Sequence, residues 1–414
     1  MRKSDLRKSE RRTSERRKSK QRMSKLGAIL CAGLLVAACS SGNGGDGDSA
    51  ATEGLPATVK VGVPLDLSGA AGIAGVGTAE RDGIRLAAKE INDTGFLGAT
   101  KVELVEIDTK ASKQEAVQSV LKLTSDGVDA VVGFTLTPSF LAAGPQLQQA
   151  GIPTVTVGLS ASGVTEVGDY MFRLYPDMAN VMPPADKEFA EAFGNVKTAA
   201  YMYQSDSEAA KVVTDKRKEV LEGMGIQTVG EETFVGTDTD VRAQLTNIKG
   251  KNPDVLVTMP LPGMMSTIYL QLEEVGYDGL VFAAPDASDA TLEQAGKAMQ
   301  CLVYATAWNG QSTEGNNTHF LEYWKANGEN RSATVFEAAG YASLWSLAHA
   351  VKAANTTDKK AVRDALAAVK DIDSPFGKIG YTENRAASVK GTKLQIVDSK
   401  ITLFDPAKSV ACER

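Results

Sequence analysis

The sequence has few of the residues that most often carry catalysis and metal binding. Its 414 residues include only two histidines, His319 and His349, and four cysteines. Structural zinc sites draw their ligands mainly from these two residue types, and a serine hydrolase needs a histidine base. The GxxxxGK[ST] motif of P-loop ATPases is also missing. We therefore predict that the chain is not an enzyme and holds no metal or cofactor.

A long apolar run is missing as well. The most apolar stretch, residues 26–38, has 13 residues, whereas a transmembrane helix needs about 20. Residues 1–38 carry 12 Lys and Arg against 3 Asp and Glu. A basic start, a short apolar stretch and small residues at its end are typical of a secretory signal peptide. The end of this segment, Val36-Ala37-Ala38-Cys39, resembles a bacterial lipobox, which implies lipid attachment to Cys39. The alternative is a buried helix with an incidental cysteine.

The charge of the remaining chain excludes one class of partner. Residues 39–414 contain 33 basic and 48 acidic residues, and nucleic-acid binding requires clustered Lys and Arg on the phosphates. Residues 39–56 are rich in Gly, Ser and Asp, a composition that predicts a flexible tether. We therefore expect an exported protein that is anchored to the outer face of the cell membrane through Cys39 and binds no nucleic acid.

Two cysteines, Cys301 and Cys412, remain beyond the predicted anchor. In an oxidising compartment an even number of cysteines favours a disulfide bond. Two separate buried thiols are the alternative.

Short β-branched runs alternate with amphipathic stretches of helical period from residue 58 onward. In the first part of the chain the pattern predicts strands at 58–65, 101–108, 128–134 and 152–158, and helices at 79–93, 112–125 and 139–150. It then restarts, with strands at 196–203, 226–234, 253–260, 280–285 and 301–308, and helices at 208–224, 240–250, 263–275 and 289–299. Helices at 316–327, 334–354 and 357–370 follow, and segments 376–382 and 393–404 suggest an antiparallel finish. This alternation predicts two α/β lobes with mainly parallel sheets.

Several blocks of the sequence resemble one known family. Leu67-Ser68-Gly69, Gly75, Gly83 and the Ile91-Asn92 pair with Gly95 match a strand, a Leu-Ser-Gly turn, a glycine-rich approach and a helix. In this order they are similar to the opening of the branched-chain amino-acid-binding proteins of ABC importers, which are type I periplasmic binding proteins. Later blocks at 127–134, 150–166, 236–257 and 336–354 extend the resemblance to about residues 59–404.

The resemblance implies two Rossmann-like lobes, each a mainly parallel sheet flanked by helices, joined by a hinge that the chain crosses several times. Lobe 1 would comprise 57–178 and 309–390, and lobe 2 would comprise 179–308 and 391–414. Cys301 and Cys412 would then share lobe 2, which makes their bond plausible. The implied partners are a small-molecule ligand and the permease and ATPase subunits of an ABC importer, and a monomer is expected.

The resemblance also assigns ligand-binding residues in lobe 1. Thr137, four residues after the strand-ending Gly133, would bind the ligand carboxylate through its hydroxyl; the alternative is an ordinary helix N-cap. Gly158 would offer its backbone and Ser160 its hydroxyl, with a plain turn as the alternative. Ser68 would lie at the cleft edge, unless its hydroxyl bonds its own backbone.

In lobe 2, Asp286 would pair with the ligand ammonium, with a helix cap as the alternative. Glu208 could attract a cationic group, although a solvated helix start explains it as well. The aromatic residues of many relatives are replaced by Ala74, Leu261 and Pro262, so recognition of the ligand side chain is not inherited.

These observations leave three function classes. The leading hypothesis is a lipid-anchored binding protein that delivers an aliphatic amino acid or another small polar ligand to an ABC importer. The first alternative is a ligand-sensing receptor of the same fold, for an amide, urea or another small molecule, without a transport role. A secreted α/β enzyme is the second, but the sequence offers no nucleophile with a base.

Overall fold

The computed structural model describes residues 54–69, 73–285, 287, 289–328, 330–410 and 412. The predicted signal peptide, the lipidation site Cys39, most of the tether and Asp286 lie outside the described residues.

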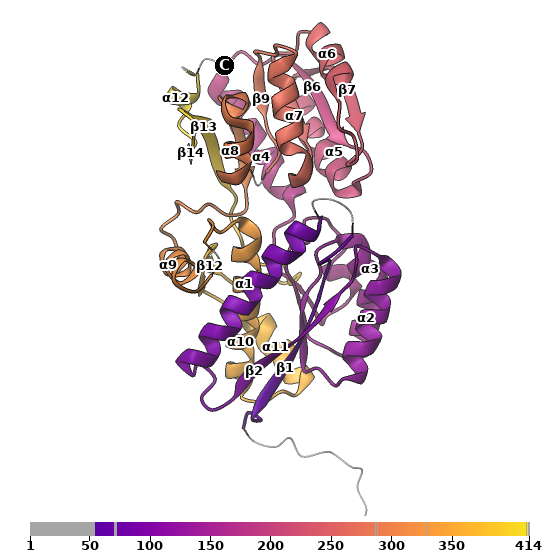
Figure 1. Ribbon diagram of the computed structural model, residues 1–414, viewed down its shortest axis with the longest axis vertical. Helices are drawn as coiled ribbons and strands as arrows, with labels where there is room; N and C mark the ends of the chain where they lie inside the picture. Colours follow the sequence, from indigo (N-terminus) through magenta and orange to yellow (C-terminus); the bar gives the residue numbers. More distant parts are fainter. Residues whose placement is uncertain are drawn as a thin grey trace, which may run out of the picture. The chain divides into compact units, whose positions relative to one another are not determined.

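Sheet A is built from the first part of the chain. Its strands are β1 (Thr58–Leu65), β2 (Lys101–Asp108), β3 (Ala130–Gly133), β4 (Thr154–Thr156) and β5 (Met171–Arg173). They pair in the order β2-β1-β3-β4-β5, and every pair is parallel. The helices around this sheet are α1 (Ile73–Thr94), α2 (Lys113–Ser125), α3 (Thr137–Gln149) and the later α10 (Val335–Ala354). Helices α1 and α10 cover one face of the sheet, and α2 and α3 cover the other (Figure 1).

Sheet B is built from the middle of the chain and its end. Its strands are β6 (Thr198–Gln204), β7 (Gln227–Phe234), β8 (Val255–Met259), β9 (Leu280–Phe282), β10 (Leu302–Thr306), β13 (Thr392–Val397) and β14 (Lys400–Leu403). The order is β14-β13-β10-β9-β8-β6-β7. Strands β6 to β10 pair in parallel, and β13 and β14 pair antiparallel. The helices of this part are α4 (Met178–Phe193), α5 (Glu208–Gly223), α6 (Arg242–Gly250), α7 (Pro262–Glu274), α8 (Asp289–Ala295) and α12 (Pro406–Val410). Two short 3₁₀ helices, Thr165–Val167 and Gly296–Met299, complete the two parts.

Late segments return to sheet A. They are α9 (Asn317–Asn327), α10, α11 (Lys359–Ala368), β11 (Ile372–Ser374) and β12 (Gly377–Ile379). Helix α10 packs along α1, and Ala386 forms a bridge with Arg173 at the edge strand β5. The chain therefore passes between the elements of the two sheets three times, at 174–177, 307–316 and 380–391. The predicted α/β fold with two mainly parallel sheets is confirmed, whereas the exact lobe boundaries stay a prediction.

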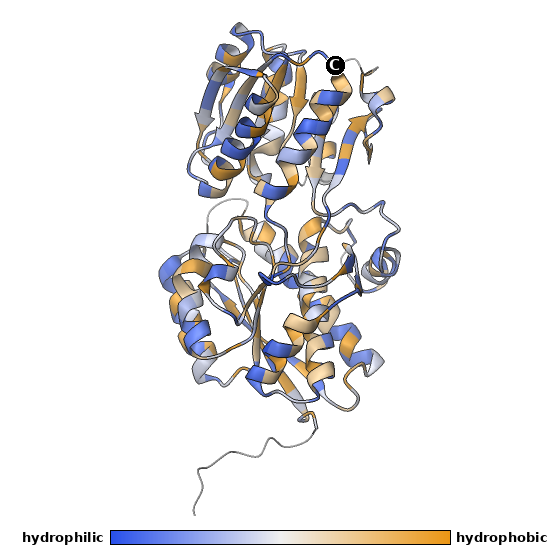
Figure 2. Ribbon diagram, turned by 180° about the vertical axis from the view of Figure 1, so that it is seen from behind, coloured by the Kyte–Doolittle hydropathy of each residue, from blue (hydrophilic) through white to orange (hydrophobic). Residues whose placement is uncertain are grey.

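Hydrophobic burial explains the layers. All five residues of β8, Val-Leu-Val-Thr-Met, are buried, as expected for a parallel strand with helices on both faces. Figure 2 shows the central strands of the sheets mainly in the hydrophobic colour and most helices in mixed colours. Helix α1 buries a stripe that includes Gly77, Glu80, Gly83 and Ile84, at the three- and four-residue spacing of one helix face.

Two glycines let α1 and α10 cross at close range. A Cβ atom at Gly83 would lie 2.0 Å from the Glu337 carbonyl oxygen, and one at Gly340 would lie 2.1 Å from the Glu80 carbonyl oxygen. Backbone atoms cannot move aside as a flexible side chain can, so both positions require glycine.

Most predicted elements are present, but several were missed, among them β5, β11, α4 and α12. Strand β5 has only three residues, too few to give a recognisable alternation. Helix α4 contains Pro183 and Pro184, and proline in a helix interior removes a hydrogen bond and argues against the helix on sequence grounds.

The expected antiparallel finish is confirmed, and it consists of two hairpins. Segment 393–404 forms β13 and β14, which turn at Asp398 and Ser399 with φ values of 53° and 56°. Such a two-residue turn with positive φ at both positions matches the twist of the flanking strands. Segment 376–382 contains β12, which pairs with β11.

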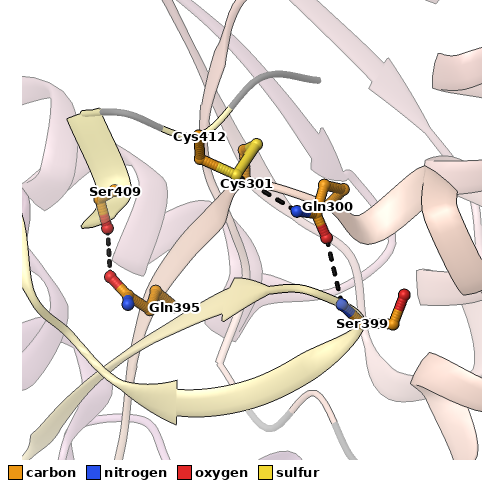
Figure 3. The surroundings of a disulfide bond; sticks show 6 residues. All are labelled: Gln300, Cys301, Gln395, Ser399, Ser409 and Cys412. Carbon is orange, nitrogen blue, oxygen red and sulfur yellow. Dashed lines mark hydrogen bonds between the residues drawn. A yellow bond between two sulfur atoms is a disulfide. The ribbon is translucent and has the colours of Figure 1, made fainter.

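The structure contains the disulfide bond Cys301–Cys412, so the alternative of two separate thiols is wrong (Figure 3). The Cα atoms of the two residues are 5.7 Å apart, and the bond closes a sequence separation of 111 residues. Gln300 donates to the Cys412 sulfur at 3.4 Å and accepts from the Ser399 backbone at 3.3 Å. The bond thus ties the chain just before β10 to the segment after α12.

Candidate functional site

The carboxyl ends of the strands in sheet A converge at a point where the chain direction splits. From β1 the chain goes first to β2 on one side and then to β3 on the other. The loops that follow β1 and β3 therefore diverge, and ligands of open α/β sheets bind in the crevice at such a switch point. This edge carries Asp66 to Ser68 after β1 and Phe134 to Thr137 after β3.

The turn after β3 directs the chain into α3. Phe134 has a φ of 69°, which is uncommon for a residue other than glycine, and its N–H donates to the Pro64 carbonyl at 2.6 Å. Its ring packs edge-on against Phe140 of α3, with the ring centroids 5.2 Å apart. Strained backbone of this kind persists where the surrounding structure holds it, and it concentrates at functional sites.

Thr137 is the first residue of α3, and its side chain is 8% exposed. The N-cap of the helix is Leu136, which makes no side-chain capping bond, so the alternative interpretation of Thr137 as the N-cap is wrong. The first N–H groups of a helix have no partner within the helix and favour a negative charge. A hydroxyl beside these N–H groups suits a carboxylate.

The loop after β4 holds the next two predicted residues. Gly158 and Ser160 are both half-buried, and the Ser160 carbonyl accepts from the Met178 backbone at the start of α4 at 3.3 Å. Since β3 and β4 are neighbours in sheet A, the loops that carry Thr137 and these two residues leave the same edge of the sheet. The plain-turn alternative remains open.

The hydrogen bond of the Ser68 hydroxyl decides one of its two interpretations, and its place at the cleft edge stays a prediction. Its hydroxyl donates to Asp108 Oδ2 at 2.6 Å rather than to its own backbone, so that alternative is wrong. The N–H groups of Leu67, Ser68 and Lys110 all point to Asp108 Oδ1, at 3.0, 3.2 and 2.8 Å. Burial alone would raise the pKa of Asp108, but these hydrogen bonds outweigh it and lower the pKa below its usual value. Ser68 therefore fastens the β1 loop to the end of β2.

Behind these loops lies a buried acidic network that the sequence interpretation missed. Thr135 donates to Glu80 Oε2 at 2.6 Å and accepts from the Asp66 N–H at 3.2 Å. Asp66 Oδ1 accepts from the Thr109 hydroxyl and, at 2.8 Å, from the Ala111 N–H. Burial raises the pKa of both Asp66 and Glu80 against the lowering effect of these bonds. The network connects α1 with the loops after β1, β2 and β3.

Sheet B has a corresponding edge, at which β6 and β8 are neighbours. The buried side chain of Gln204, the last residue of β6, accepts from the Leu261 N–H after β8 at 3.2 Å. Glu208 is exposed at the start of α5, where Ser207 is the N-cap, and this fits the solvated helix start that the sequence left open. Asp286 follows β9 outside the described residues.

A buried ion pair supports this edge of sheet B. Arg217 of α5 is fully buried and forms two bonds with the Asp186 carboxylate of α4, at 2.6 and 2.9 Å. It also donates to the carbonyls of Thr258 and Phe282, at 2.9 and 3.0 Å, at the ends of β8 and β9. One guanidinium thus joins two helices and two strands.

Comparison with known proteins now identifies the family. The sequence model of the periplasmic binding proteins matches residues 58–400. This chain belongs to the periplasmic binding protein family. The predicted resemblance is confirmed, and the relatives described below place the chain near the branched-chain amino-acid-binding members.

Two curated relatives illustrate the similarity. The leucine-, isoleucine-, valine-, threonine- and alanine-binding protein of Pseudomonas aeruginosa is 23% identical over 328 residues, which are 79% of this chain and 86% of that protein. The Leu/Ile/Val-binding protein BraC3 of Rhizobium johnstonii is 24% identical over 339 residues, 79% of this chain and 88% of that protein.

Solved structures share the fold. The branched-chain amino acid transporter substrate-binding protein LivJ of Streptococcus pneumoniae, in complex with isoleucine, has a TM-score of 0.74 and 26% identity, over 83% of this chain and 97% of that chain. A solute-binding protein of an ABC transporter from Rhodopseudomonas palustris, in complex with 3,4-dihydroxybenzoic acid, has a TM-score of 0.75 and 24% identity, over 84% and 96% of the two chains.

Other features of this periplasmic binding protein give no site. A cavity of about 710 Å³ opens beside α11, lined among others by Asp169, Arg363, Lys370 and Arg385. Its two arginines have partners, since Arg363 pairs with Asp169 and Arg385 donates to the Thr165 carbonyl at 2.8 Å. Within the described residues there is no cluster of three potential metal ligands, and no helix there is long and apolar enough to cross a membrane.

The missed residues did leave a signal in the sequence. Glu80 lies four residues before Ile84 in the apolar stripe of α1, and Arg217 lies four residues after Val213 in that of α5. A charged residue at the centre of an apolar helix face needs a buried partner or a neutral form. That spacing predicts burial, but it cannot name the partner.

Proposed function

We propose that this protein is an extracytoplasmic, lipid-anchored solute-binding protein that captures a small amino acid of the branched-chain or aliphatic class and delivers it to an ABC importer. Capture would occur by closure of lobe 1 (57–178 and 309–390) on lobe 2 (179–308 and 391–414), followed by release to the permease. Cys39 would carry the lipid. The curated relatives named for binding leucine, isoleucine and valine support the ligand class, and the isoleucine complex of LivJ supports it further.

One observation carries the proposal: the Thr137 hydroxyl lies at the open N-terminus of α3, at the switch point of sheet A. There the hydroxyl and the free N–H groups would bind the ligand carboxylate. Gly158 and Ser160, from the neighbouring loop, would complete the carboxylate site. Asp286 would bind the ammonium group, and Glu208 would contribute negative charge.

The side-chain pocket is less defined by the family. Ala74, Leu261 and Pro262 stand where many relatives have aromatic residues, and smaller residues leave a wider apolar wall. The same fold holds an aromatic acid in the Rhodopseudomonas palustris protein, so the fold alone does not fix the ligand. A panel must therefore include leucine, isoleucine, valine, alanine, threonine, an amide and an aromatic acid.

Titration calorimetry of the purified chain against this panel tests the proposal. We expect an aliphatic amino acid to bind, and we expect Thr137→Ala to weaken it roughly 10- to 100-fold, since a hydrogen bond to a charged group contributes about 1.5–3 kcal/mol. Thr137→Ser should retain most of the affinity, and Thr124→Ala, which loses only a helix-internal bond to the Val120 carbonyl, serves as the control.

Two results would contradict the proposal. If no amino acid binds the wild-type chain, the ligand class is wrong, and full affinity in Thr137→Ala would reject the site. Uptake of the bound amino acid by a deletion strain then separates transport from sensing, because a pure sensor would leave uptake unchanged.

A further inference from the structure

Glu80 places a carboxyl group in the interior directly behind the candidate site. It is 0% exposed and occupies the apolar stripe of α1. Through the Thr135 hydroxyl, which donates to Glu80 and accepts from the Asp66 N–H, it is linked to the loops after β3 and β1. Thr135 stands two residues before Thr137.

The other carboxyl oxygen of Glu80 abuts the loop after β4. A Cβ atom built on Gly158 would lie 1.9 Å from Glu80 Oε1 and 3.2 Å from its Cδ, and no other atom outside the immediate chain lies within 4 Å. The φ of Gly158 is outside the left-handed region. The backbone therefore does not require glycine at 158, and the atoms that an added Cβ would meet belong to the buried carboxyl group of Glu80.

The surroundings of Glu80 favour its neutral form. Oε1 has no hydrogen-bond partner, and the same holds for Asp66 Oδ2. The charged groups that act on Glu80 are Asp66 from the end of β1 and Glu337 from α10, both acidic, while Thr135 and Gly158 face it from β3 and β4. Arg331 pairs with Glu337 and with Asp82. Burial, opposed by the Thr135 bond and reinforced by the two acids, raises the pKa of Glu80 well above its usual value.

We propose that Glu80 is a positioning residue of the ligand site, whose carboxyl group sets the spacing of the loops after β3 and β4, which carry Thr137, Gly158 and Ser160. The inference rests on the proposed function only where it calls this site a ligand site. The spacing of the two loops can be measured without a ligand. A glutamine at position 80, which is uncharged and has the same shape, should therefore keep both loops in place. Removal of the Glu80 carboxyl group should loosen both loops. Ionisation should disturb them, because a carboxylate would be buried beside two acids.

The first experiment tests the contact between Glu80 and Gly158 by a double-mutant cycle. Gly158→Ala should lower the melting temperature by roughly 2–5 °C, the effect of an extra methyl group in a packed site. In a Glu80→Ala background the same change should cost less than half as much, because both atoms within 4 Å are gone. Equal losses in the two backgrounds would overturn the proposal.

The second experiment measures loop order in the ligand-free protein by hydrogen exchange. We expect Glu80→Ala to increase exchange about tenfold in segments 133–137 and 156–160, and Glu80→Gln to change it less than twofold. Glu90→Ala is the matched control: Glu90 is also buried on α1, but it bonds His319 and Tyr341. Unchanged loops in Glu80→Ala, or equal loosening in Glu90→Ala, would contradict the proposed role.

The third experiment measures the affinity for L-isoleucine at pH 6. Glu80→Gln should match the wild type, and Glu80→Ala should bind at least fivefold more weakly. A tenfold loss in Glu80→Gln would overturn the inference. If L-isoleucine does not bind the wild type, the proposed ligand is wrong, and the first two experiments still decide the role of Glu80.

Discussion

The two sheets have the same strand order, but the buried acids beside them have different charged neighbours. Sheet A runs β2-β1-β3-β4-β5, and the parallel part of sheet B runs β7-β6-β8-β9-β10, so the two chains of connections are equivalent. In sheet B the buried acid Asp186 faces Arg217. In sheet A the buried acid Glu80 faces other acids. The same architecture therefore supports one edge by an ion pair and the other by a carboxyl group whose charged neighbours are acidic.

A second pair of acids, at equivalent positions in the two sheets, has pKa values shifted in opposite directions. Asp129 before β3 accepts from the Lys60 N–H of β1 at 2.8 Å, and Asp254 before β8 accepts from the Thr198 N–H of β6, also at 2.8 Å. These positions are equivalent in the two sheets. Burial raises the pKa of Asp129 despite its hydrogen bond. The pKa of Asp254 is lowered, because the hydrogen bonds from Lys197 and Thr198 outweigh the effect of its smaller burial.

The largest effect is expected from breaking the ion pair of sheet B. Asp186→Ala leaves the Arg217 guanidinium buried without its partner, which should cost about 3–5 kcal/mol of the free energy of unfolding. Replacing both residues, as Asp186→Leu with Arg217→Met, should cost less than Asp186→Ala or Arg217→Met alone. Urea denaturation measures the free energy of unfolding of the three variants, and Asp215→Ala at the exposed Lys211–Asp215 pair is the control. A mild effect of Asp186→Ala would remove the contrast between the sheets.

The disulfide bond gives the second largest effect, and it belongs to the sheet B part alone. Cys301→Ser with Cys412→Ser should lower the free energy of unfolding by about 2–4 kcal/mol, because the unfolded chain loses a constraint. Urea denaturation of the variant and of the wild type under reducing conditions should agree. Equal stability of the oxidised wild type and the variant would show that the bond contributes nothing.

The close crossing of α1 and α10 belongs to the sheet A part. Gly340→Ala should cost about 1–3 kcal/mol, since its Cβ would meet backbone atoms of α1. Gly223→Ala in α5 is the control on the other side of the comparison, because nothing lies within 4 Å of its Cβ. Thermal unfolding distinguishes them. Similar behaviour of the two variants would mean that the crossing can relax.

The smallest effects are expected at the equivalent aspartates, with opposite signs. Because its pKa is lower in the folded protein, ionised Asp254 stabilises the fold at pH values above the pKa of the unfolded chain, about 3.9. This contribution disappears as the pH falls through the pKa of the folded protein. Asp254→Asn should therefore be less stable than the wild type at pH 7, with the difference vanishing toward pH 3.

For Asp129 the sign reverses. Its raised pKa contributes stability below about pH 3.9, which is lost as the pH rises through the folded value. Asp129→Asn should be at least as stable as the wild type at pH 7. Urea denaturation from pH 3 to 7 compares the two variants, and a change of the same sign in both would refute the distinction.

Local patterns in the sequence predicted most of the fold. Runs such as Val-Leu-Val-Thr-Met in β8 and the apolar stripe of α1 depend only on neighbouring residues. Strand β5 and the proline-containing α4 were missed, since their formation depends on tertiary support. Segment 393–404 was predicted as one element, although the polar turn residues Asp398 and Ser399 divide it into β13 and β14.

The candidate site was predicted in part. Thr137 is at the start of a helix on the expected edge, as the family resemblance suggested, but Ser68 is engaged with Asp108. Glu80 and Arg217 both appear in the sequence as charged residues within apolar stripes. Whether each of them has a neighbour of opposite charge depends on Asp66, Glu337 and Asp186, which lie on other elements.

The sequence by itself determined the alternation of strands and helices, and with it two mainly parallel sheets, because hydrophobic periodicity is a local property of the chain. Only the tertiary structure decided which buried acid has a cation as its partner and which has acidic neighbours, and which glycines must remain glycines. Those outcomes depend on distances of a few ångströms between segments that are far apart in the chain.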